Sequence, residues 1–519
     1  MARTPLLNML RRIARERAAG DVAERGAVER GAADRGLIGR RAVLGLGAGA
    51  ALSAMVPAVG LAATARIAIV GAGLAGLTAA HRLRKAGYDV DVFEGSTRLG
   101  GRCYTARGVF GDNQIAEHGG EFIDSGHKEI RALARELGLV LDDVLAATPP
   151  RTRSLYLFDG RPYTLADATR DFQPLYPILQ QQSAAVGEYD YRAANAAARR
   201  FDAMTITDWI AAYVVGGRSG QFGQLIETAL AEENGADADQ QSALNVISAL
   251  AANRRNNFNL YNTDSDQRFH VRGGNDQITT LLGKSLGARV RTAMPLAAVL
   301  RLPDGRIRLS LKRDGGLVDM VYDRVILALP FSIMRSAVDF KEAGFQPLKR
   351  QAIATLPMGA SAKFQLQFTR RAWTDAGCNG EIRVPSRSFQ TTWEVTRAQA
   401  GEAGILNFFS GGTRALNVGK TDAVTLASAV MKDAEPIVPG LSGLWTGLMT
   451  KDAWKENPWS LGSYSYYQPG YQTSVAGIEA EAEGNCFFAG EHTASQTGFL
   501  NAAVESGMRA AGQVVASLG

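Results

Sequence analysis

The feature that most constrains this chain is a glycine-rich turn between a strand-like segment and a helix-like segment. Residues 66–70 form a short, mainly apolar run typical of a buried strand, and residues 77–85 have the apolar pattern of a helix. Between them stands Gly-Ala-Gly-Leu-Ala-Gly, residues 71–76. This order of strand, turn and helix is the fingerprint of a dinucleotide-binding unit. A glycine turn without a ligand is the weaker alternative, because both flanking elements are present.

Each position of this turn has its own physical role. Gly71 permits a tight turn, Gly73 lets the backbone come close to a pyrophosphate, and Gly76 allows the helix to lie close to the strand. The amides at the start of the helix, at Leu74 and Ala75, then point at the phosphates.

Three further segments carry glycines and charges that suit a dinucleotide. A second strand over residues 89–93 ends in an acid, placed where an acceptor for a ribose hydroxyl is expected. Two glycines and an arginine follow, able to approach a second phosphate or a ring system, and another glycine pair stands beside an acid. The candidate cofactor-binding residues of these segments are Glu94, Gly100, Gly101, Arg102, Gly119, Gly120 and Glu121.

The net charge of +6 is concentrated at the N-terminus. Residues 1–65 hold ten Arg, no Lys and five acids, a net charge of +5, which leaves +1 for residues 66–519. A nucleic-acid-binding domain presents a strongly basic surface. The nearly neutral body therefore indicates no nucleic-acid partner.

The first 65 residues are predicted to be a leader. Residues 1–39 are Arg-rich with no apolar face, which is typical of disorder. The arginine pair at 40–41 then opens an uncharged stretch rich in Gly and Ala, and residues 63–65 have the small-x-small form of a cleavage site. This pattern predicts twin-arginine export to the periplasm. A membrane anchor interrupted by Pro57 and a mis-assigned start are the alternatives.

The three cysteines do not point to a metal or a disulfide framework. Cys103, Cys378 and Cys486 are odd in number and far apart in the sequence. We therefore predict no metal site.

Near the C-terminus a second glycine motif leads into the last helix. Phe487-Phe488-Ala489-Gly490-Glu491 is typical of a buried strand entering a turn, and residues 498–515 have the pattern of a helix. With the first fingerprint, this motif resembles the flavin-dependent amine oxidases, which include monoamine, polyamine and L-amino-acid oxidases. The resemblance runs from about Ile67 to the C-terminus.

The resemblance implies that FAD is the cofactor and assigns roles to the C-terminal motif. Gly490 and Glu491 match the positions that close the flavin site, with Glu491 as acceptor for the ribityl chain. The helix N-terminus at Gly498 would face the polar edge of the flavin, where negative charge develops on reduction.

Lys363 lies in a run, residues 359–368, that alternates as a strand. This register places Lys363 on the face opposite Phe364, Leu366 and Phe368. The pattern alone indicates a solvated lysine. The resemblance implies the reverse, because a lysine at this position in the family holds a water against the reactive flavin nitrogen and assists reoxidation by O₂.

Two aromatic residues match the walls of the family's substrate cage. Tyr464 corresponds to one wall and Phe499 to the other, and such walls steer an amine toward the flavin in its neutral, hydride-donating form. The alternative is that both are ordinary core aromatics, in a segment that is rich in aromatics.

Three positions depart from family patterns. Ser463 stands where animal monoamine oxidases have the cysteine that links flavin, so we expect non-covalent FAD. Phe122 replaces an arginine that pairs with the substrate carboxylate in several L-amino-acid oxidases. Asp124 aligns with a position that recognises a substrate nitrogen in polyamine oxidases. Together with Glu121, it favours a substrate that carries a second positive charge. Both acids are equally compatible with exposed loop positions.

The predicted fold is α/β, with a Rossmann-like FAD-binding domain built from non-contiguous segments and a substrate domain with a mixed sheet and a helical insertion. The segments are residues 1–65 for the leader, 66–127, 262–345 and 440–519 for the FAD-binding domain, and 128–261 and 346–439 for the substrate domain.

The predicted activity is FAD-dependent oxidation of a primary or secondary amine, with di- and polyamines included, by hydride transfer, with O₂ reduced to H₂O₂. An L-amino-acid oxidase for basic or aromatic amino acids is the first alternative, and a flavin dehydrogenase or desaturase, against which Lys363 argues, is the second. The expected partners are the small-molecule substrate and O₂, with membrane contact only through the export signal and a homodimer left open.

Overall fold

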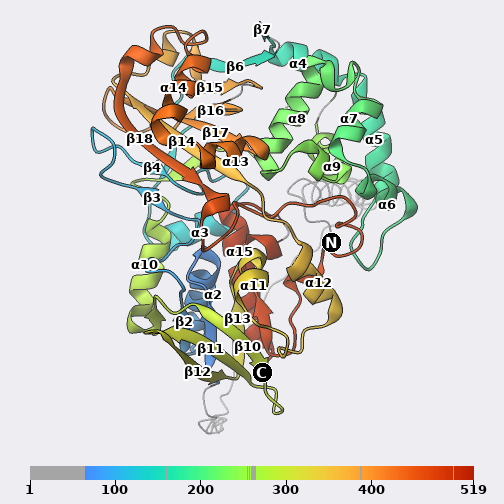
Figure 1. Cartoon of the computed structure of the whole chain (residues 1–519), viewed down its shortest axis with the longest axis vertical. Coiled ribbons are helices and arrows are strands. Elements are labelled where there is room, and N and C mark those ends of the chain that lie inside the picture. Colours follow the sequence, from blue (N-terminus) through green and yellow to red (C-terminus); the bar gives the residue numbers. More distant parts are fainter. Residues whose placement is uncertain are drawn as a thin grey trace, which may run out of the picture.

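A five-stranded parallel sheet forms around the glycine turn (Figure 1). Its order is β19-β13-β1-β2-β9, and every neighbouring pair is parallel. The strands are β1 (Ile67–Val70), β2 (Val90–Phe93), β9 (Val290–Arg291), β13 (Arg324–Leu327) and β19 (Cys486–Phe488). All four residues of β1 are buried, since a parallel sheet is covered on both faces.

The structure is a computed structural model that describes residues 65–518, except 159, 254, 256–257, 259–264, 386–387 and 495. The predicted leader and export signal therefore lie outside the described residues, apart from Ala65. None of the described helices is long and apolar enough to cross a membrane.

Two layers cover the parallel sheet. On one face the apolar sides of four helices share a core with Ile67 and Ile69. These helices are α2 (Leu74–Lys85), α3 (Lys128–Glu136), α10 (Gln277–Leu286) and α15 (Leu500–Ala516). On the other face, Ala68 and Val70 join a core formed by an antiparallel sheet and two helices. These are β10 (Leu296–Arg301), β11 (Ile307–Arg313), β12 (Gly316–Tyr322), α11 (Phe331–Ala337) and α12 (Pro347–Thr355).

A mixed seven-stranded sheet forms the second half of the molecule, in the order β18-β14-β17-β16-β15-β6-β7. Its strands are β6 (Arg153–Phe158), β7 (Arg161–Pro162), β14 (Ser361–Phe368), β15 (Cys378–Arg383), β16 (Thr391–Glu394), β17 (Gly404–Gly411) and β18 (Trp445–Ala453). As the alternation predicts, Phe364, Leu366 and Phe368 enter the core beneath α13 (Thr413–Lys420) and α14 (Ala423–Ala434). Lys363 points to the opposite face and contacts the segment that carries Glu117 and Glu121.

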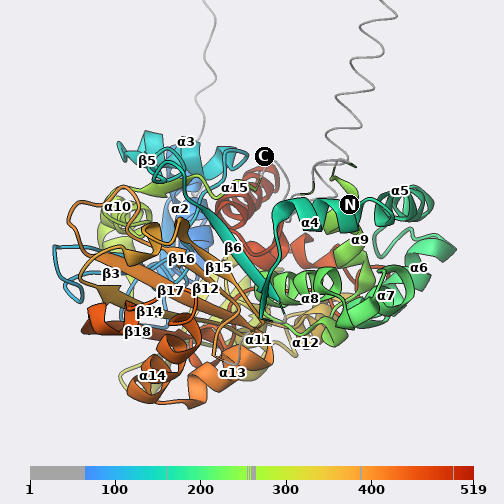
Figure 2. The ribbon, with the colours of Figure 1, turned by 90° about the horizontal axis from the view of Figure 1, so that it is seen from above.

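Six helices lie beside this sheet, as the views in Figures 1 and 2 show. They are α4 (Leu165–Phe172), α5 (Leu175–Val186), α6 (Ala196–Ala203), α7 (Ile206–Tyr213), α8 (Gln221–Asn234) and α9 (Ala243–Ala251), and they share one apolar core. Two small sheets complete the described fold, from β3 (Thr105–Ala106) with β4 (Ala116–Glu117) and β5 (Leu141–Asp143) with β8 (Phe269–Val271). The predicted α/β class, with non-contiguous strands and a helical insertion, is confirmed.

Two elements cross the predicted domain boundaries. Helix α3 begins at 128, in the segment predicted for the substrate domain, but its residues Ile130 and Leu133 pack in the core of the parallel sheet. Strand β18, predicted for the FAD-binding domain, pairs with β14 of the seven-stranded sheet. The position of α3 is decided by the packing of its apolar face, and that of β18 by its pairing at the edge of the seven-stranded sheet.

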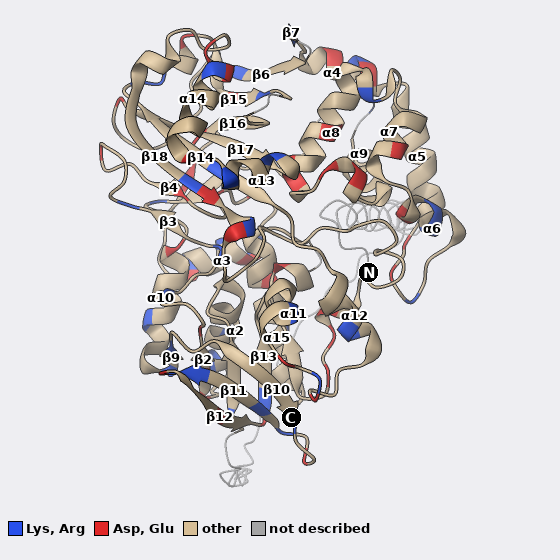
Figure 3. Ribbon diagram, in the orientation of Figure 1, with Lys and Arg blue, Asp and Glu red and all other residues tan. Residues whose placement is uncertain are grey.

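Positive and negative side chains are interspersed over both halves of the molecule (Figure 3). Many form pairs, such as Arg107 with Asp276 and Arg272 with Asp142. This distribution agrees with the nearly neutral charge of the body.

Candidate functional site

A cavity of about 630 Å³ runs from the glycine turn of β1 to the polar face of the seven-stranded sheet. It brings together nearly all of the candidate residues, although they come from widely separated segments. Those that line it are Gly71, Gly73, Leu74, Ala75, Glu94, Gly100, Gly101, Arg102, Gly119, Gly120, Glu121, Phe122, Asp124, Lys363, Tyr464, Gly490, Glu491, Gly498 and Phe499. Gly76 does not line the cavity.

The three glycines of the turn differ in what surrounds them. Gly71 has φ +103°, and a Cβ there would lie 2.7 Å from the carbonyl oxygen of Ala328. A Cβ on Gly76 would lie 1.9 Å from the oxygen of Gly71, so this position serves helix–strand packing. A Cβ on Gly73 would meet only the oxygen of Gly100, at 3.9 Å. The space beside Gly73 is therefore open toward the cavity.

Two helix N-termini face the cavity without a capping side chain. Gly73 precedes α2 and Phe499 precedes α15, and neither makes a side-chain cap. Neither helix has an acid in its first turn. Their free amide groups and positive dipole ends therefore offer two places for negative charge along one cavity.

Glu94 fixes the glycine turn through hydrogen bonds to backbone amides. One carboxylate oxygen accepts from the amide of Ala72 at 2.7 Å and the other from the amide of Ser96 at 2.8 Å. Each oxygen has a second lone pair, so the acceptor role toward a ribose hydroxyl stays a prediction.

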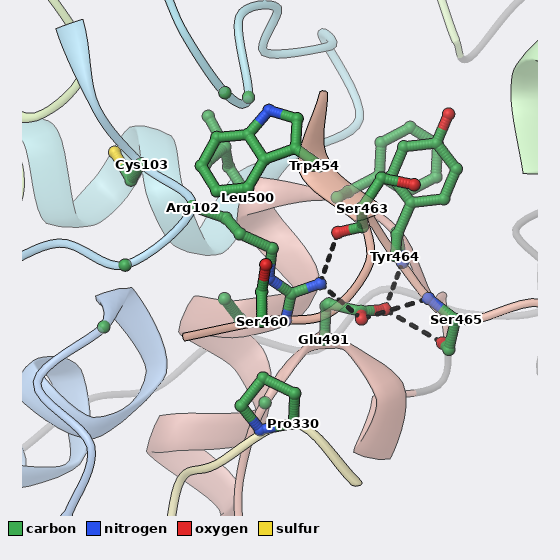
Figure 4. A pocket seen from close by; sticks show the side chains of 18 of the residues that line it. Arg102, Cys103, Pro330, Trp454, Ser460, Ser463, Tyr464, Ser465, Glu491 and Leu500 are labelled. Carbon is green, nitrogen blue, oxygen red and sulfur yellow. Dashed lines mark hydrogen bonds and ion pairs between the residues drawn. The ribbon is translucent and has the colours of Figure 1, made fainter. Parts of the chain in front are cut away.

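Arg102 and Glu491 form an ion pair across the middle of the cavity (Figure 4). Arg102 Nη1 lies 2.8 Å from Glu491 Oε1 and donates to the carbonyl oxygen of Ser463 at 2.6 Å. Glu491 also accepts from the Ser465 hydroxyl and from the amide of Gly498. Burial alone raises the pKa of the Glu491 carboxyl, but the Arg102 guanidinium outweighs it and the net pKa lies below the usual value. Glu491 is therefore an anion that fixes both segments.

Lys363 is buried, contrary to what its strand pattern alone indicates. Its Nζ lies 2.7 Å from Glu121 Oε2 and donates to the carbonyl oxygen of Glu117 at 3.0 Å. The exposed fraction is 6% for Lys363 and 7% for Glu121, so the pair is shielded from water. The same cation lies 5.5 Å from the centre of the Trp393 ring.

The two predicted aromatic walls are held by different contacts. The hydroxyl of Tyr464 donates to the carbonyl oxygen of Glu232 at 2.7 Å and accepts from Ser361 at 3.0 Å. The ring of Phe499 lies 5.0 Å from the ring of His127. Both aromatics are partly buried and line the cavity, so they are not plain core residues.

Asp124 and Glu121 are buried, so exposed loop positions are the wrong interpretation of both. Asp124 accepts from the amide of Gln267 at 2.8 Å, and its own amide donates to Nδ1 of His127 at 3.0 Å. Burial lowers the pKa of His127 to about 4. The neutral imidazole therefore links Asp124 to Phe499.

Among the other residues that line the cavity, three bear on its chemistry and belong to no motif of the sequence. Trp393 lies 5.9 Å from Phe122 and 5.2 Å from Phe409, between ring centres, so these aromatics surround the end that holds Lys363. Phe409 is the register partner of Lys363, so strand alternation with the correct pairing would have found it. The third is Glu233, near the end of α8, which no motif marks.

The comparisons with known proteins agree with this geometry. The sequence model described as "Flavin containing amine oxidoreductase" matches residues 74–515. The flavin-dependent L-tryptophan oxidase RebO of Lentzea aerocolonigenes is 25% identical over 486 residues, covering 86% of this chain and 97% of that protein. The flavin-containing amine oxidase A of Sus scrofa is 24% identical over 463 residues, covering 87% and 85%.

Two solved structures are similar in fold. Wild-type putrescine oxidase bound to putrescine aligns with a TM-score of 0.74 and 22% identity, covering 87% of this chain and 99% of that one. Cyclohexylamine oxidase from Brevibacterium oxydans IH-35A aligns with a TM-score of 0.76 and 19% identity, covering 88% and 99%. Because the family model spans most of the chain and the fold agrees, the protein belongs to the flavin-containing amine oxidoreductases.

Proposed function

We propose that this protein is an FAD-dependent amine oxidase that converts a primary or secondary amine to an imine and reduces O₂ to H₂O₂. The imine then hydrolyses to a carbonyl compound and ammonia or a smaller amine. The observation that carries the proposal is one continuous cavity that contains both the Gly73 turn and the buried Lys363. A dinucleotide and a reaction centre can therefore share one space.

The residues along the cavity fit FAD. The open space beside Gly73 and the free amides of α2 suit the pyrophosphate. The uncapped N-terminus of α15 suits the edge of the flavin that becomes negative on reduction. Arg102 and Glu491, whose ion pair crosses the cavity, and the amide of Gly498 next to α15 add polar groups suited to the chain that joins the two ends of the cofactor.

Bound FAD would supply the acceptor for the hydride of the substrate α-carbon and the means of passing the electrons to O₂. The protein orients the substrate and tunes the reactivity of the flavin. Tyr464 and Phe499 present ring surfaces that hold a neutral amine, and the Tyr464 ring is fixed by two hydrogen bonds. Lys363 supplies a buried cation or a water held by it, and such a charge stabilises the negative charge that forms on oxygen.

Binding of FAD without a covalent bond is part of the proposal. Ser463, at the position that carries cysteine in some relatives, hydrogen-bonds Gly359 and Ser361 instead. Cys103 is the cysteine that lines the cavity, and burial with the nearby Glu117 raises the pKa of its thiol far above the usual value. A thiol held protonated is a poor nucleophile. Flavin should therefore separate from acid-precipitated protein.

The charges of the cavity favour an amine over an amino acid. Its described basic residues are Arg98, Arg102 and Lys363. Arg102 pairs with Glu491 and Lys363 with Glu121. Arg98 donates to the carbonyl oxygens at 99 and 101 and lies over the Tyr104 ring. Each already has partners, so a substrate carboxylate finds no open cation among them.

The test compares each amine with the amino acid that has the same side chain, using peroxide formation and anaerobic bleaching of the flavin. The proposal expects amines to bleach the flavin and to yield H₂O₂ on admission of air. If no amine and no amino acid bleaches it, the proposal is wrong.

An L-amino-acid oxidase is the second candidate, supported by similarity to RebO and to other proteins named L-amino-acid oxidase. In the same assay this candidate requires the amino acid to be used in preference to its amine. It also requires a cation other than the three named above to meet the carboxylate.

A further inference from the structure

Glu233 is a carboxylate in the cavity that the mechanism does not use. It lies in the last turn of α8 and lines the cavity together with Tyr464 and Asp124. No residue that the structure describes donates a hydrogen bond or forms an ion pair with it. The other acids that line the cavity have such partners, for example Lys363 for Glu121 and Arg102 for Glu491.

The position of Glu233 is unfavourable in the protein alone. Burial and the neighbouring Asp124 carboxylate raise its pKa to about 7. The C-terminal end of a helix also carries partial negative charge, which repels an anion in the last turn. Burial, the Asp124 carboxylate and the helix end therefore all disfavour the charged form of Glu233. A cation bound beside this side chain would offset all three contributions.

The backbone around Glu233 is held firmly in place. The carbonyl oxygen of the preceding residue, Glu232, accepts the hydrogen bond of the Tyr464 hydroxyl at 2.7 Å. The Glu232 side chain forms a fully buried ion pair with Arg383 on β15. These contacts fix the end of α8 relative to the aromatic wall. The Glu233 carboxylate is thus presented at a set place beside the reactive end of the cavity.

We infer that Glu233 binds a second, positively charged nitrogen of the substrate, so that the enzyme prefers diamines to monoamines of the same length. This inference rests on the proposed amine oxidation. One nitrogen reacts in its neutral form between Tyr464 and Phe499, while the distal ammonium donates to Glu233. Asp124 also lines the cavity, and its carboxylate, which interacts with Glu233, adds to the negative potential.

The experiment compares α,ω-diamines of three to six carbons with n-alkylamines of equal length, in the FAD-bound full chain. Peroxide assays give kcat and KM, and anaerobic titration of the flavin spectrum gives Kd. A charge-assisted hydrogen bond within the cavity predicts that at least one diamine has a KM and Kd about 10- to 100-fold lower than its alkylamine. In Glu233→Gln that advantage disappears, while alkylamine kinetics stay near those of the wild type.

Two variants serve as controls. Glu227→Gln makes the same change of charge on the same helix, at a residue that pairs with Arg218 on the surface, and it should keep the diamine preference. Glu233→Asp keeps the charge and should keep part of the preference, which matters if Glu233→Gln folds poorly.

The outcomes separate the two proposals. If alkylamines are oxidised but no diamine is preferred by the wild type, the inference about Glu233 is overturned and the oxidase activity stands. An equal loss for both substrate series in Glu233→Gln, or a loss of preference in Glu227→Gln, also overturns it. If no amine reduces the flavin, the proposed function itself fails.

Discussion

Nζ of Lys363 lies 2.7 Å from Oε2 of Glu121, and the two residues are 242 positions apart. Lys363 extends from the polar face of β14, and Glu121 follows the glycine pair Gly119-Gly120, which lines the same cavity. The fold therefore places a compensated charge pair where the two halves of the molecule meet.

Replacing Lys363 by Met should slow the oxidation of reduced flavin by O₂ on the order of 10- to 100-fold, because a buried positive charge near the forming oxygen anion is lost. Reduction of the flavin by an amine should change much less. Stopped-flow measurement of the two half-reactions separates them. Equal slowing of both would contradict the assigned role.

Removing Lys363 alone should also destabilise the protein, because it leaves the Glu121 carboxylate buried and unpaired. Breaking a buried pair in this way costs about 3–5 kcal/mol. The double variant Lys363→Met/Glu121→Gln should recover most of the thermal stability but not the rate of reoxidation. Recovery of both would show that the lysine acts through folding only.

Two glycines of the turn should respond in opposite ways to alanine. Gly73→Ala places a Cβ in open space, 3.9 Å from the nearest described atom, so the protein should fold but lose flavin. Gly76→Ala places a Cβ 1.9 Å from a backbone oxygen, so the parallel sheet itself should be disrupted. Circular dichroism and the ratio of flavin to protein absorbance distinguish them. Full flavin content in Gly73→Ala would contradict the pyrophosphate assignment.

The preference for diamines should depend on pH. Glu233, with a pKa of about 7, is an anion only above that value, whereas the distal ammonium stays protonated to about pH 10. The ratio of kcat/KM for a diamine to that for its alkylamine should therefore rise between pH 6 and pH 8, the range of about one unit on either side of this pKa. In Glu233→Gln the ratio should be flat, and a rise of equal size there would contradict the assignment.

Acid should destabilise the fold through His492. Its buried ring makes an edge-to-face contact with the ring of Phe331, with 4.5 Å between the ring centres. Burial lowers the pKa of His492 to about 3. In the unfolded chain the His492 imidazole takes up a proton near pH 6.5. The stability that the neutral ring contributes is therefore fully present above that pH and is lost toward pH 3, at about 1.4 kcal/mol per pH unit. Thermal unfolding from pH 7 to pH 4, a span of about three units below that value, should show a shallower decline in His492→Phe. Parallel curves would contradict it.

Export is proposed from the leader. If the arginine pair at 40–41 is a twin-arginine signal, its replacement by two lysines should keep folded, flavin-loaded protein in the cytoplasm. Cell fractionation followed by immunoblotting measures this. Unchanged periplasmic content would rule out the signal.

The sequence by itself was sufficient for features decided within a few residues. The glycine turn from Gly71 to Gly76 depends on local φ angles and close backbone contacts, which restrict these positions to glycine. The alternation around Lys363 correctly gave its face of the strand, because side chains of a strand point to opposite sides at every step. Family resemblance then extended these local patterns to an α/β fold.

Tertiary structure alone decided which charges meet. Strand alternation indicated a solvated Lys363, and only the approach of the segment around Glu121 buries and compensates it. Glu233 has no motif at all, and its place beside Tyr464 follows from the packing of α8 against the seven-stranded sheet. Backbone preferences act between neighbours in sequence, whereas burial and charge pairing depend on neighbours in space, and those exist only once the chain has folded.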